Sequence, residues 1–288
     1  MKAEHSGKTR RTSAHKRGTV AKQDGAGKRS AGKQDGTAKQ DRTGKRGERA
    51  GRPRRVLVLD VGGTHVKMRI NARGAVRKLV SGPSMRPQDM VDAVLGLLAD
   101  WRYDAISIGY PGVVFHGRIV ADPHNLGAGW IGFDFARAFG SRVRIVNDAA
   151  MQAMGSYRGG RMLFLGLGTG LGATLILDGV VEPMEIGHLP YRHGRSYEDY
   201  VGEHGYRKLG AKKWRKAVTD VVERLRVALE VDYVVLGGGN THKLRKLPKG
   251  AHRGDNQNAF VGGVRLWEQS EAAMLVLGTG KRRGTARR

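Results

Sequence analysis

Runs of apolar residues divide the middle of the chain into alternating strands and helices. Four consecutive apolar residues, Val56–Leu59, predict a buried strand, and a second strand follows through Val66, Met68 and Ile70. Pro87–Trp101 carries apolar residues on one helical face and predicts a helix. This alternation predicts an α/β protein. The further expected strands and helices are Arg77–Val80, Ala105–Ile108, Phe133–Phe139, Val143–Val146, Met162–Leu167, Leu171–Leu177, Trp214–Glu230, Tyr233–Leu236 and Asn258–Leu275.

An acidic, glycine-rich turn joins the first two strands, in the sequence VLVLDVGGTHVK. Asp60 ends the first strand, and Gly62 and Gly63 let the backbone approach a ligand closely. Backbone N–H groups in such a turn suit phosphate oxygens, and the Asp60 carboxylate suits Mg²⁺ or its water shell. The turn connects two strands, whereas P-loop and Rossmann turns lead into a helix. An ordinary hairpin turn is the alternative interpretation.

The second half of the chain repeats this device about a hundred residues later. The turn Gly168–Gly170 lies between two predicted strands, and a later strand ends in the triple glycine Gly237–Gly239. Two glycine-turn hairpins suggest two related lobes that face one cleft. Between them, Asp148 directly follows a predicted strand, which suits a carboxylate exposed in a cleft. Its alternative use is as the N-cap of the helix expected at Ala149–Tyr157.

The net charge of +26 is concentrated at the two ends of the chain. Residues 1–55 carry +13 and the last eight residues +5, which leaves +8 on residues 56–280. The N-terminal segment is low in complexity and nearly free of large apolar residues, so we expect disorder. It is interpreted either as a polyanion-binding arm or as a solvated extension from a misassigned start codon. With no cysteine, no secretion signal and no membrane-length apolar run, a cytoplasmic protein without membrane contact is expected.

With these motifs in order, the chain resembles the ROK sugar kinases of the actin/hexokinase/Hsp70 superfamily. Within that family it looks most similar to bacterial polyphosphate glucokinases, from about Val56 to Leu277. The resemblance implies a two-lobed α/β fold of the ribonuclease-H-like, actin/hexokinase type. The implied divisions are a basic tail at 1–53, a first lobe at 54–147, a second lobe at 148–280 and a basic tail at 281–288. The last helix is expected to pack back on the first lobe.

The resemblance also implies roles for individual residues. Asp148 matches the catalytic base, which accepts the proton of the attacking sugar hydroxyl. Asp60 is expected to hold Mg²⁺, directly or through water. The implied sugar-binding residues are Asn125, Asn147, Asp148, Glu185, His188 and Glu198. The implied phosphate-binding residues are Gly62, Gly63, Thr64, Lys67, Gly168, Thr169 and Gly170, and Gly237, Gly238 and Gly239 match a nucleotide-binding segment.

The implied activity is phosphorylation of the 6-hydroxyl of glucose or a related hexose, with polyphosphate or ATP as donor. Basic segments at Lys208–Lys216 and Lys243–Lys249 are candidates for a polyphosphate groove, or else solvated charged faces. A strictly ATP-dependent glucokinase remains an alternative. So does a sugar-responsive regulator or nucleic-acid-binding protein with an inert kinase-like core. Relatives with a structural zinc use cysteines that this chain lacks, so none is expected here; a homodimer is compatible with the family.

Overall fold

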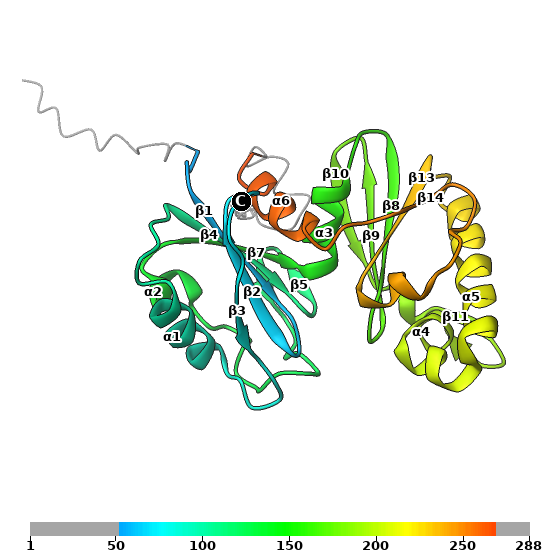
Figure 1. Ribbon diagram of the computed structural model, residues 1–288, viewed down its shortest axis with the longest axis horizontal. Helices are drawn as coiled ribbons and strands as arrows, with labels where there is room; N and C mark the ends of the chain where they lie inside the picture. Colours follow the sequence, from blue (N-terminus) through cyan, green and yellow to red (C-terminus); the bar gives the residue numbers. More distant parts are fainter. Residues whose placement is uncertain (1–51, 269–288) are drawn as a thin grey trace, which may run out of the picture. The chain divides into compact units, whose positions relative to one another are not determined.

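The computed structural model describes residues 52–268, which form two five-stranded sheets (Figure 1). The strand order is β3-β2-β1-β4-β7 in the first sheet and β10-β9-β8-β13-β14 in the second. Each sheet combines an antiparallel hairpin with parallel neighbours. The strands are β1 (Val56–Val61), β2 (His65–Ile70), β3 (Arg77–Val80), β4 (Ala105–Tyr110), β7 (Arg142–Asn147), β8 (Arg161–Leu167), β9 (Leu171–Leu177), β10 (Val180–Met184), β13 (Tyr233–Gly237) and β14 (Ala251–Arg253).

Helices cover both sheets and lie between them. Helix α1 (Pro87–Leu97) and the short α2 (Phe135–Phe139) share an apolar core with the first sheet, and α5 (Glu203–Ala228) shares one with the second. Helices α3 (Asp148–Ser156) and α6 (Asn258–Arg265) pack in a third core with residues of β1 and β8. The smaller elements are β5 (Val114–Phe115), β6 (Arg118–Ile119), η1 (Ile186–His188), β11 (Pro190–Arg192), β12 (Arg195–Ser196), α4 (Tyr197–Val201) and η2 (Gly239–Lys243).

Small residues allow α3 and α6 to touch. A Cβ on Gly155 would lie 1.9 Å from the carbonyl oxygen of Asn258, and one on Gly262 would lie 1.7 Å from that of Met151. Helix α6 also contacts the first sheet, because a Cβ on Gly263 would meet Val58 at 2.4 Å. The hydroxyl of Ser107, on β4, donates to the Gly263 carbonyl at 2.6 Å. Helix α3, which begins with Asp148, is therefore held against α6 by close contacts of its backbone.

The α/β fold expected from the sequence is confirmed, with corrections at three helices. Helix α1 ends at Leu97, short of the predicted Trp101, where the Arg77 guanidinium caps the Leu97 carbonyl at 2.6 Å. Helix α5 starts at Glu203 and bends at Gly210, which has φ of 73°. The last helix ends at Arg265, and its predicted extension past residue 268 lies outside the described residues. Within residues 52–268, no helix is long and apolar enough to span a membrane.

Candidate active site

The first glycine turn presents a buried carboxylate beside a lysine. Asp60 and Lys67 are direct cross-strand partners in the β1–β2 hairpin, so their side chains share one face of the sheet. Lys67 Nζ lies 3.3 Å from Asp60 Oδ2. Burial raises the pKa of Asp60, and the charge of Lys67 partly offsets that rise. The lysine predicted to bind phosphate is thus the partner of the carboxylate predicted to hold Mg²⁺.

Short-range hydrogen bonds shape this turn. Gly62 N–H donates to the His65 carbonyl at 3.0 Å and closes the turn. Ser81, just past β3, donates its hydroxyl to the Gly62 carbonyl at 2.6 Å and its N–H to the Thr64 carbonyl at 3.0 Å. Asn125 packs so closely on Gly63 that a Cβ there would lie 2.7 Å from the Asn125 Cβ. The sequence reasoning missed Ser81, because its contact depends on the pairing of β3 with β2.

Asp148 is the first residue of α3, and Asn147 is its N-cap. Asn147 Oδ1 accepts the N–H groups of Ala149 and Ala150 at 2.9 and 3.2 Å, and Nδ2 donates to the Gly112 carbonyl at 3.0 Å. The alternative interpretation of Asp148 as the N-cap is therefore wrong. Asp148 Oδ1 accepts the N–H of Ala149 at 2.7 Å. Because Asn147 caps the helix, the second carboxylate oxygen of Asp148 is not used in capping.

The electrostatic surroundings of Asp148 suit proton transfer. Burial, then the negative charge of Asp60 and a smaller effect of Glu185, raise its pKa to about 7 from an ordinary 3.8, against the lowering effect of Ala149 N–H. Asp60 belongs to the first sheet, whereas Glu185 follows β10 of the second. Residues from both sheets therefore act on one carboxyl group, whose pKa is matched to a general base at neutral pH.

The second glycine turn, Gly168–Gly170, is surrounded by residues that follow it in the chain. Glu198 Oε2 accepts the N–H of Leu171 at 3.1 Å, and a Cβ on Gly170 would lie 2.1 Å from this oxygen. Gly238 has φ of 82°, and a Cβ there would lie 2.5 Å from the Leu167 carbonyl oxygen. The triple glycine therefore packs directly against the strand that leads into the turn.

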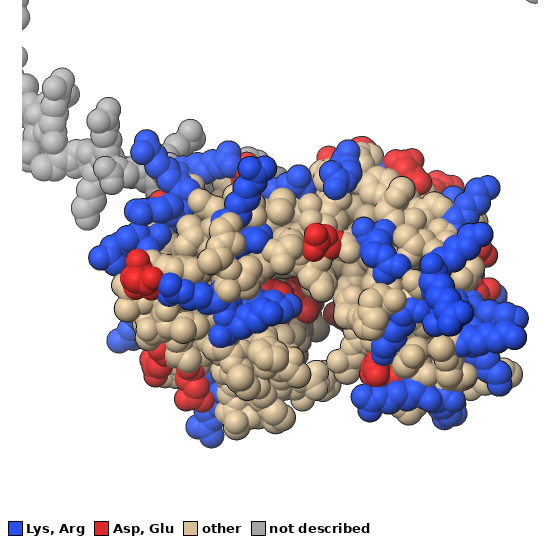
Figure 2. All heavy atoms as spheres, in the orientation of Figure 1, with Lys and Arg blue, Asp and Glu red and all other residues tan. Residues whose placement is uncertain are grey.

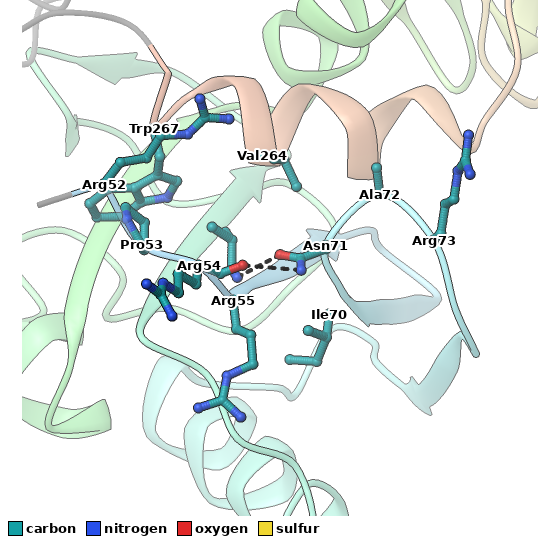
Figure 3. A pocket seen from close by; sticks show the side chains of 11 residues that line it. Arg52, Pro53, Arg54, Arg55, Ile70, Asn71, Ala72, Arg73, Val264 and Trp267 are labelled. Carbon is teal, nitrogen blue, oxygen red and sulfur yellow. Dashed lines mark hydrogen bonds between the residues drawn. The ribbon is translucent and has the colours of Figure 1, made fainter.

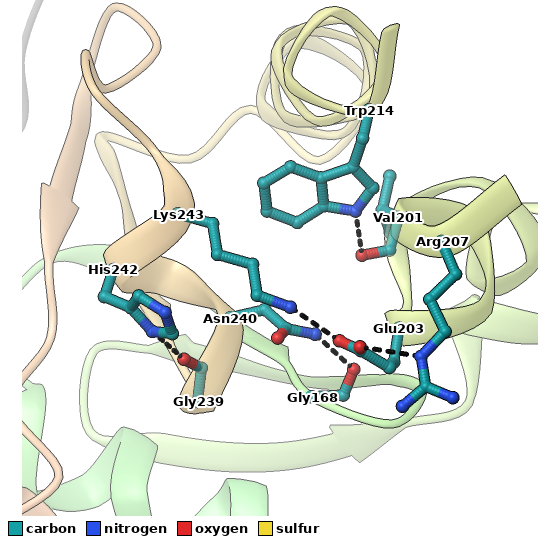
Figure 4. A network of polar contacts seen from close by, with 9 residues as sticks. All are labelled: Gly168, Val201, Glu203, Arg207, Trp214, Gly239, Asn240, His242 and Lys243. Atoms are coloured by element: carbon teal, nitrogen blue, oxygen red, sulfur yellow. Dashed lines mark hydrogen bonds and ion pairs between the residues drawn. The ribbon is translucent and has the colours of Figure 1, made fainter. Parts of the chain in front are cut away.

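A polar network fastens the same turn to α5 and η2 (Figure 4). The N–H of Glu203 donates to the carbonyls of Gly168 and Thr169 at 3.0 and 3.1 Å. Asn240 Nδ2 donates to the Gly168 carbonyl at 2.8 Å, and Lys243 Nζ lies 2.8 Å from Glu203 Oε2. Sequence reasoning assigned no role to Glu203 or Asn240. Only the position of Asn240, directly after the triple glycine, could have drawn attention to it.

Glu185 and His188 lie at the ends of a short helical turn beside the second hairpin. Glu185 Oε2 and His188 Nε2 are 3.6 Å apart, and the two side chains are 60% and 70% exposed. Gly187, between them, approaches the Leu171 carbonyl so closely that a Cβ would lie 2.8 Å from its oxygen. The pair is thus accessible to a ligand and connected to the second glycine turn, and Glu185 also affects Asp148.

Two basic grooves lie apart from the predicted site residues. One, of about 640 Å³, lies at the start of β1 and is lined by Arg52, Arg54, Arg55 and Arg73 together with Trp267 and apolar residues (Figure 3). This end of β1 is opposite to the end that carries Asp60. The other, of about 370 Å³, lies on α5. Neither groove contains one of the individual residues predicted to bind sugar or phosphate, but the second is lined by Arg215, Lys216, Arg245 and Lys246, from the two basic segments considered for polyphosphate.

No protein-family model matches the chain. It is 32% identical over 161 residues to the polyphosphate glucokinase of Mycobacterium tuberculosis (strain CDC 1551 / Oshkosh), an alignment that covers 51% of this chain and 60% of that protein. Its fold is similar to that of the inorganic polyphosphate/ATP-glucomannokinase of Arthrobacter sp. strain KM, with a TM-score of 0.64, 20% identity and coverage of 74% and 98% of the two chains. The chain has the fold of the ROK sugar kinases.

A ROK family glucokinase from Streptomyces griseus, solved with glucose and AMPPNP, supports the same conclusion, with a TM-score of 0.59, 16% identity and coverage of 75% and 100%. The resemblance to ROK sugar kinases expected from the glycine motifs is therefore confirmed, including the similarity to polyphosphate glucokinases. The sequence alignment spans about 60% of the length of the mycobacterial relative. These comparisons establish the fold and the likeness to the family.

Proposed function

We propose that this protein is a hexose kinase that phosphorylates the 6-hydroxyl of glucose, with Asp148 as general base. The observation that carries this proposal is the Asp148 carboxyl group, whose pKa is raised to about 7 at the start of α3 by burial and by Asp60 and Glu185. A carboxylate of that pKa can take a proton at neutral pH and release it again after the reaction. Polyphosphate glucokinases among its relatives make glucose the first acceptor to test.

In the proposed reaction, the sugar O6 forms a bond to the terminal phosphorus of the donor while the bond from that phosphorus to its bridging oxygen breaks. Asp148 takes the hydroxyl proton as the new bond forms. Asn147 caps α3 and so fixes the direction of the neighbouring carboxylate. The turns at Gly62–Thr64 and Gly168–Gly170 would bind phosphate oxygens through their backbone N–H groups.

The residues around Asp60 fit a magnesium ion. The negative charge of Asp60 contributes to the raised pKa of Asp148, and Lys67 is the cation paired with Asp60. The residues of 52–268 include no cluster of three or more potential metal ligands. Mg²⁺ in phosphoryl transfer commonly takes one or two carboxylates and completes its shell with water and phosphate. Asp60 would therefore hold it, directly or through water, and the ion would neutralise charge on the transferred phosphate.

The sugar site is proposed from four further residues. Glu185 and His188 are exposed and adjacent, and would accept and donate hydrogen bonds to sugar hydroxyls. Asn125, against the first glycine turn, and Glu198, against the second, would contact the sugar from opposite sides. Asn147 has most of its hydrogen-bonding capacity used within the protein, which leaves one Nδ2 hydrogen for a ligand. Its main proposed task is therefore to orient Asp148.

Polyphosphate is the proposed donor, with ATP as the alternative. The names of the mycobacterial and Arthrobacter relatives include polyphosphate, and the second-lobe surface around α5 is rich in lysine and arginine. A long polyanion binds such a surface in a salt-dependent manner. The basic tails, outside the described residues, are proposed as additional polyanion-binding segments. A chain that begins at Arg52 tests this, because its KM for polyphosphate at low salt should rise if the N-terminal tail contributes.

A coupled assay for glucose 6-phosphate tests the function directly. The purified protein is supplied with glucose, Mg²⁺ and either ATP or polyphosphate. We expect product with polyphosphate at higher kcat/KM than with ATP. Absence of a phosphorylated product with both donors, sought by mass spectrometry with glucose, mannose and their amino derivatives as acceptors, would refute the kinase proposal. Size-exclusion chromatography with light scattering on the same preparation tests whether the protein forms the homodimer that the family resemblance allows.

A further inference from the structure

The second glycine turn is held by two elements that a bound donor would meet next. The N-terminus of α5 reaches the turn through Glu203 N–H, which donates to the Gly168 and Thr169 carbonyls. Helix η2 reaches it through Asn240 Nδ2, 2.8 Å from the Gly168 carbonyl oxygen. Figure 4 shows η2 and the start of α5 on either side of the polar network that includes Gly168. A donor that binds this turn and extends toward α5 and η2 would meet their side chains.

A salt bridge joins these two elements. Lys243 Nζ, from η2, lies 2.8 Å from Glu203 Oε2, from α5, and the side chains are only 18% and 28% exposed. The second carboxylate oxygen of Glu203 accepts Arg207 Nε at 3.1 Å. Hydrogen bonds from Lys243 and then Arg207 lower the pKa of Glu203 to about 2. The carboxylate is thus charged and fully engaged throughout the neutral pH range.

The side chains around the Lys243–Glu203 salt bridge are unsuited to binding a nucleobase. Purine sites use apolar or aromatic faces on which the ring stacks, with a few directed polar groups. Here the aromatic residue nearest the salt bridge is Tyr206, and the Lys243 ammonium covers its ring at 3.8 Å from the centroid. Trp214 packs edge-to-face on Tyr206, with a centroid distance of 5.4 Å, and is itself fully buried. Stacking a base here requires that Lys243 leave both Tyr206 and Glu203.

Basic side chains continue outward from the same bridge. Arg215 Nε donates to the Lys243 carbonyl at 2.8 Å and lines the groove on α5. Figure 2 shows lysines and arginines gathered at the right of the molecule, where α5 lies in Figure 1. Asp220, an acidic residue of the groove, is paired with arginines at 2.7 and 3.1 Å. The groove is lined by Arg215, Lys216, Thr219, Asp220, Glu223, Arg245 and Lys246.

We propose that the Lys243–Glu203 salt bridge selects the phosphoryl donor. It covers the ring of Tyr206 beside the Gly168–Gly170 turn and so denies a nucleoside an aromatic face there, while a linear polyphosphate extends past it along the basic side chains of η2 and α5. A nucleotide must part the salt bridge to bury its base, and a polyphosphate does not. Selectivity then arises because only the nucleotide has to spend binding free energy on breaking the salt bridge. This inference rests on the proposed function, because it assumes that the second glycine turn binds donor phosphates.

The test uses Lys243→Ala, which uncovers Tyr206, and Glu203→Gln, which keeps the side-chain shape and the backbone contacts of the turn. Arg73→Met is the control, since it removes one exposed positive charge from the β2–β3 connection. Binding of ADP and of tripolyphosphate to the full-length protein is measured by calorimetry, and kcat/KM for ATP, polyphosphate and glucose by the coupled assay. Thermal melts verify that each variant folds.

We expect Lys243→Ala to tighten ADP binding about tenfold relative to tripolyphosphate binding. In the coupled assay the same change should appear mainly as a lower KM for ATP, with the KM for glucose unchanged. Glu203→Gln should shift the ratio in the same direction by a smaller factor, and Arg73→Met should leave it unchanged. A ratio within twofold of wild type in both folded variants, or equal loss for both donors, would overturn the inference. If the wild type phosphorylates glucose with neither donor, the proposed function fails, while the ADP-to-tripolyphosphate binding ratio still decides the inference.

Discussion

The two glycine-turn hairpins have similar sequences but are supported in different ways. The β1–β2 turn is closed by Gly62 and His65 and braced by Ser81, all within about twenty residues of one another. The β8–β9 turn is held by Glu203 and Asn240, which come from well downstream. The first turn also carries a buried charged pair, Asp60 and Lys67, whereas the charged pair beside the second, Glu203 and Lys243, belongs to its supports.

This difference predicts that the two turns have different tasks. A locally supported turn with a buried carboxylate suits a constant task, such as holding an ion against the reacting phosphate. The second turn is held by α5 and η2, which come later in the chain. Substitutions in those helices can therefore alter the surroundings of the turn while the sequence of the turn stays the same. Donor preference is therefore expected to depend on the second turn, and the chemical step on Asp60 and Asp148. The predictions below test this separation.

The largest expected effect comes from Asp148→Asn, which removes the base between the two turns. Turnover should fall about 10³-fold with both donors, because a general base contributes this order of rate enhancement. Glucose binding should be largely retained. The raised pKa means that the ionised carboxylate destabilises the folded state, by a penalty absent below pH 3.8 and complete above about pH 7. The melting temperature of the variant should therefore exceed that of wild type at pH 8, by about 2–4 °C.

Glucose binding and melting curves at pH 5 and pH 8 complete this test. The stabilisation should be smaller at pH 5 than at pH 8. Asp178→Asn, in the β9–β10 turn, is the matched control, because asparagine tolerates the positive φ of 48° found there. Turnover of Asp148→Asn within tenfold of wild type would exclude Asp148 as the base.

Asp60→Asn should lower turnover about 10²-fold and raise the Mg²⁺ concentration needed for half-maximal activity, since a neutral amide is a weaker magnesium ligand. Both donors should be affected alike, because Asp60 belongs to the first turn. Activity is measured across a Mg²⁺ titration. Asp92→Asn, on the exposed face of α1, is the control and should change nothing. An unchanged Mg²⁺ dependence would remove the proposed role of Asp60.

Gly238→Ala should destabilise the protein by about 2–4 kcal/mol, since Gly238 combines a positive φ with a carbonyl oxygen 2.5 Å from the added Cβ. Its neighbour provides the matched control: a Cβ on Gly239 meets nothing within 4 Å. Gly239→Ala should therefore cost less than about 1 kcal/mol. Urea denaturation of both variants measures the difference. Equal costs would show that the close packing of the triple glycine on β8 is not needed.

Activity should rise with pH up to about 7 and then level off. The carboxyl of Asp148 must be ionised to accept a proton, and its pKa is raised to about 7, so each unit below that value should reduce kcat/KM about tenfold. The profile is recorded from pH 5.5 to 8.5 at constant ionic strength. A flat profile would mean that no buried carboxyl with a neutral pKa takes part in the rate-limiting chemistry.

The smallest effect is expected from Ser81→Ala, which removes the hydroxyl contact with the Gly62 carbonyl. The loss of one hydrogen bond should cost about 1 kcal/mol of stability. It should reduce activity with ATP and polyphosphate by the same factor, because the first turn does not distinguish donors. Ser84→Ala, at an exposed position a few residues later, is the control. A change in the ratio of the two donors would contradict the separation of tasks between the turns.

The sequence by itself predicted most of the strands and the order of the motifs. Four buried apolar residues in a row, as in Val56–Leu59, define a strand locally, and a glycine turn after it needs no distant partner. For the same reason Asp60 and Asp148 could be found at the ends of strands. The first half of α5 was missed, because its lysines and arginines show no apolar face and Gly210 interrupts it. Both the correctly predicted strands and the missed first half of α5 follow from patterns within a short stretch of sequence.

Only the tertiary structure decided what surrounds each of these residues. That Asn147, and not Asp148, caps α3 depends on side-chain direction within one turn of helix. The raised pKa of Asp148 depends on charges from two sheets, and the pairing of Glu203 with Lys243 joins residues 40 positions apart. Electrostatic energies vary with distance and burial, which spacing along the chain does not encode. The sequence thus determined which chemical groups were present, and the fold determined which of them act on one another.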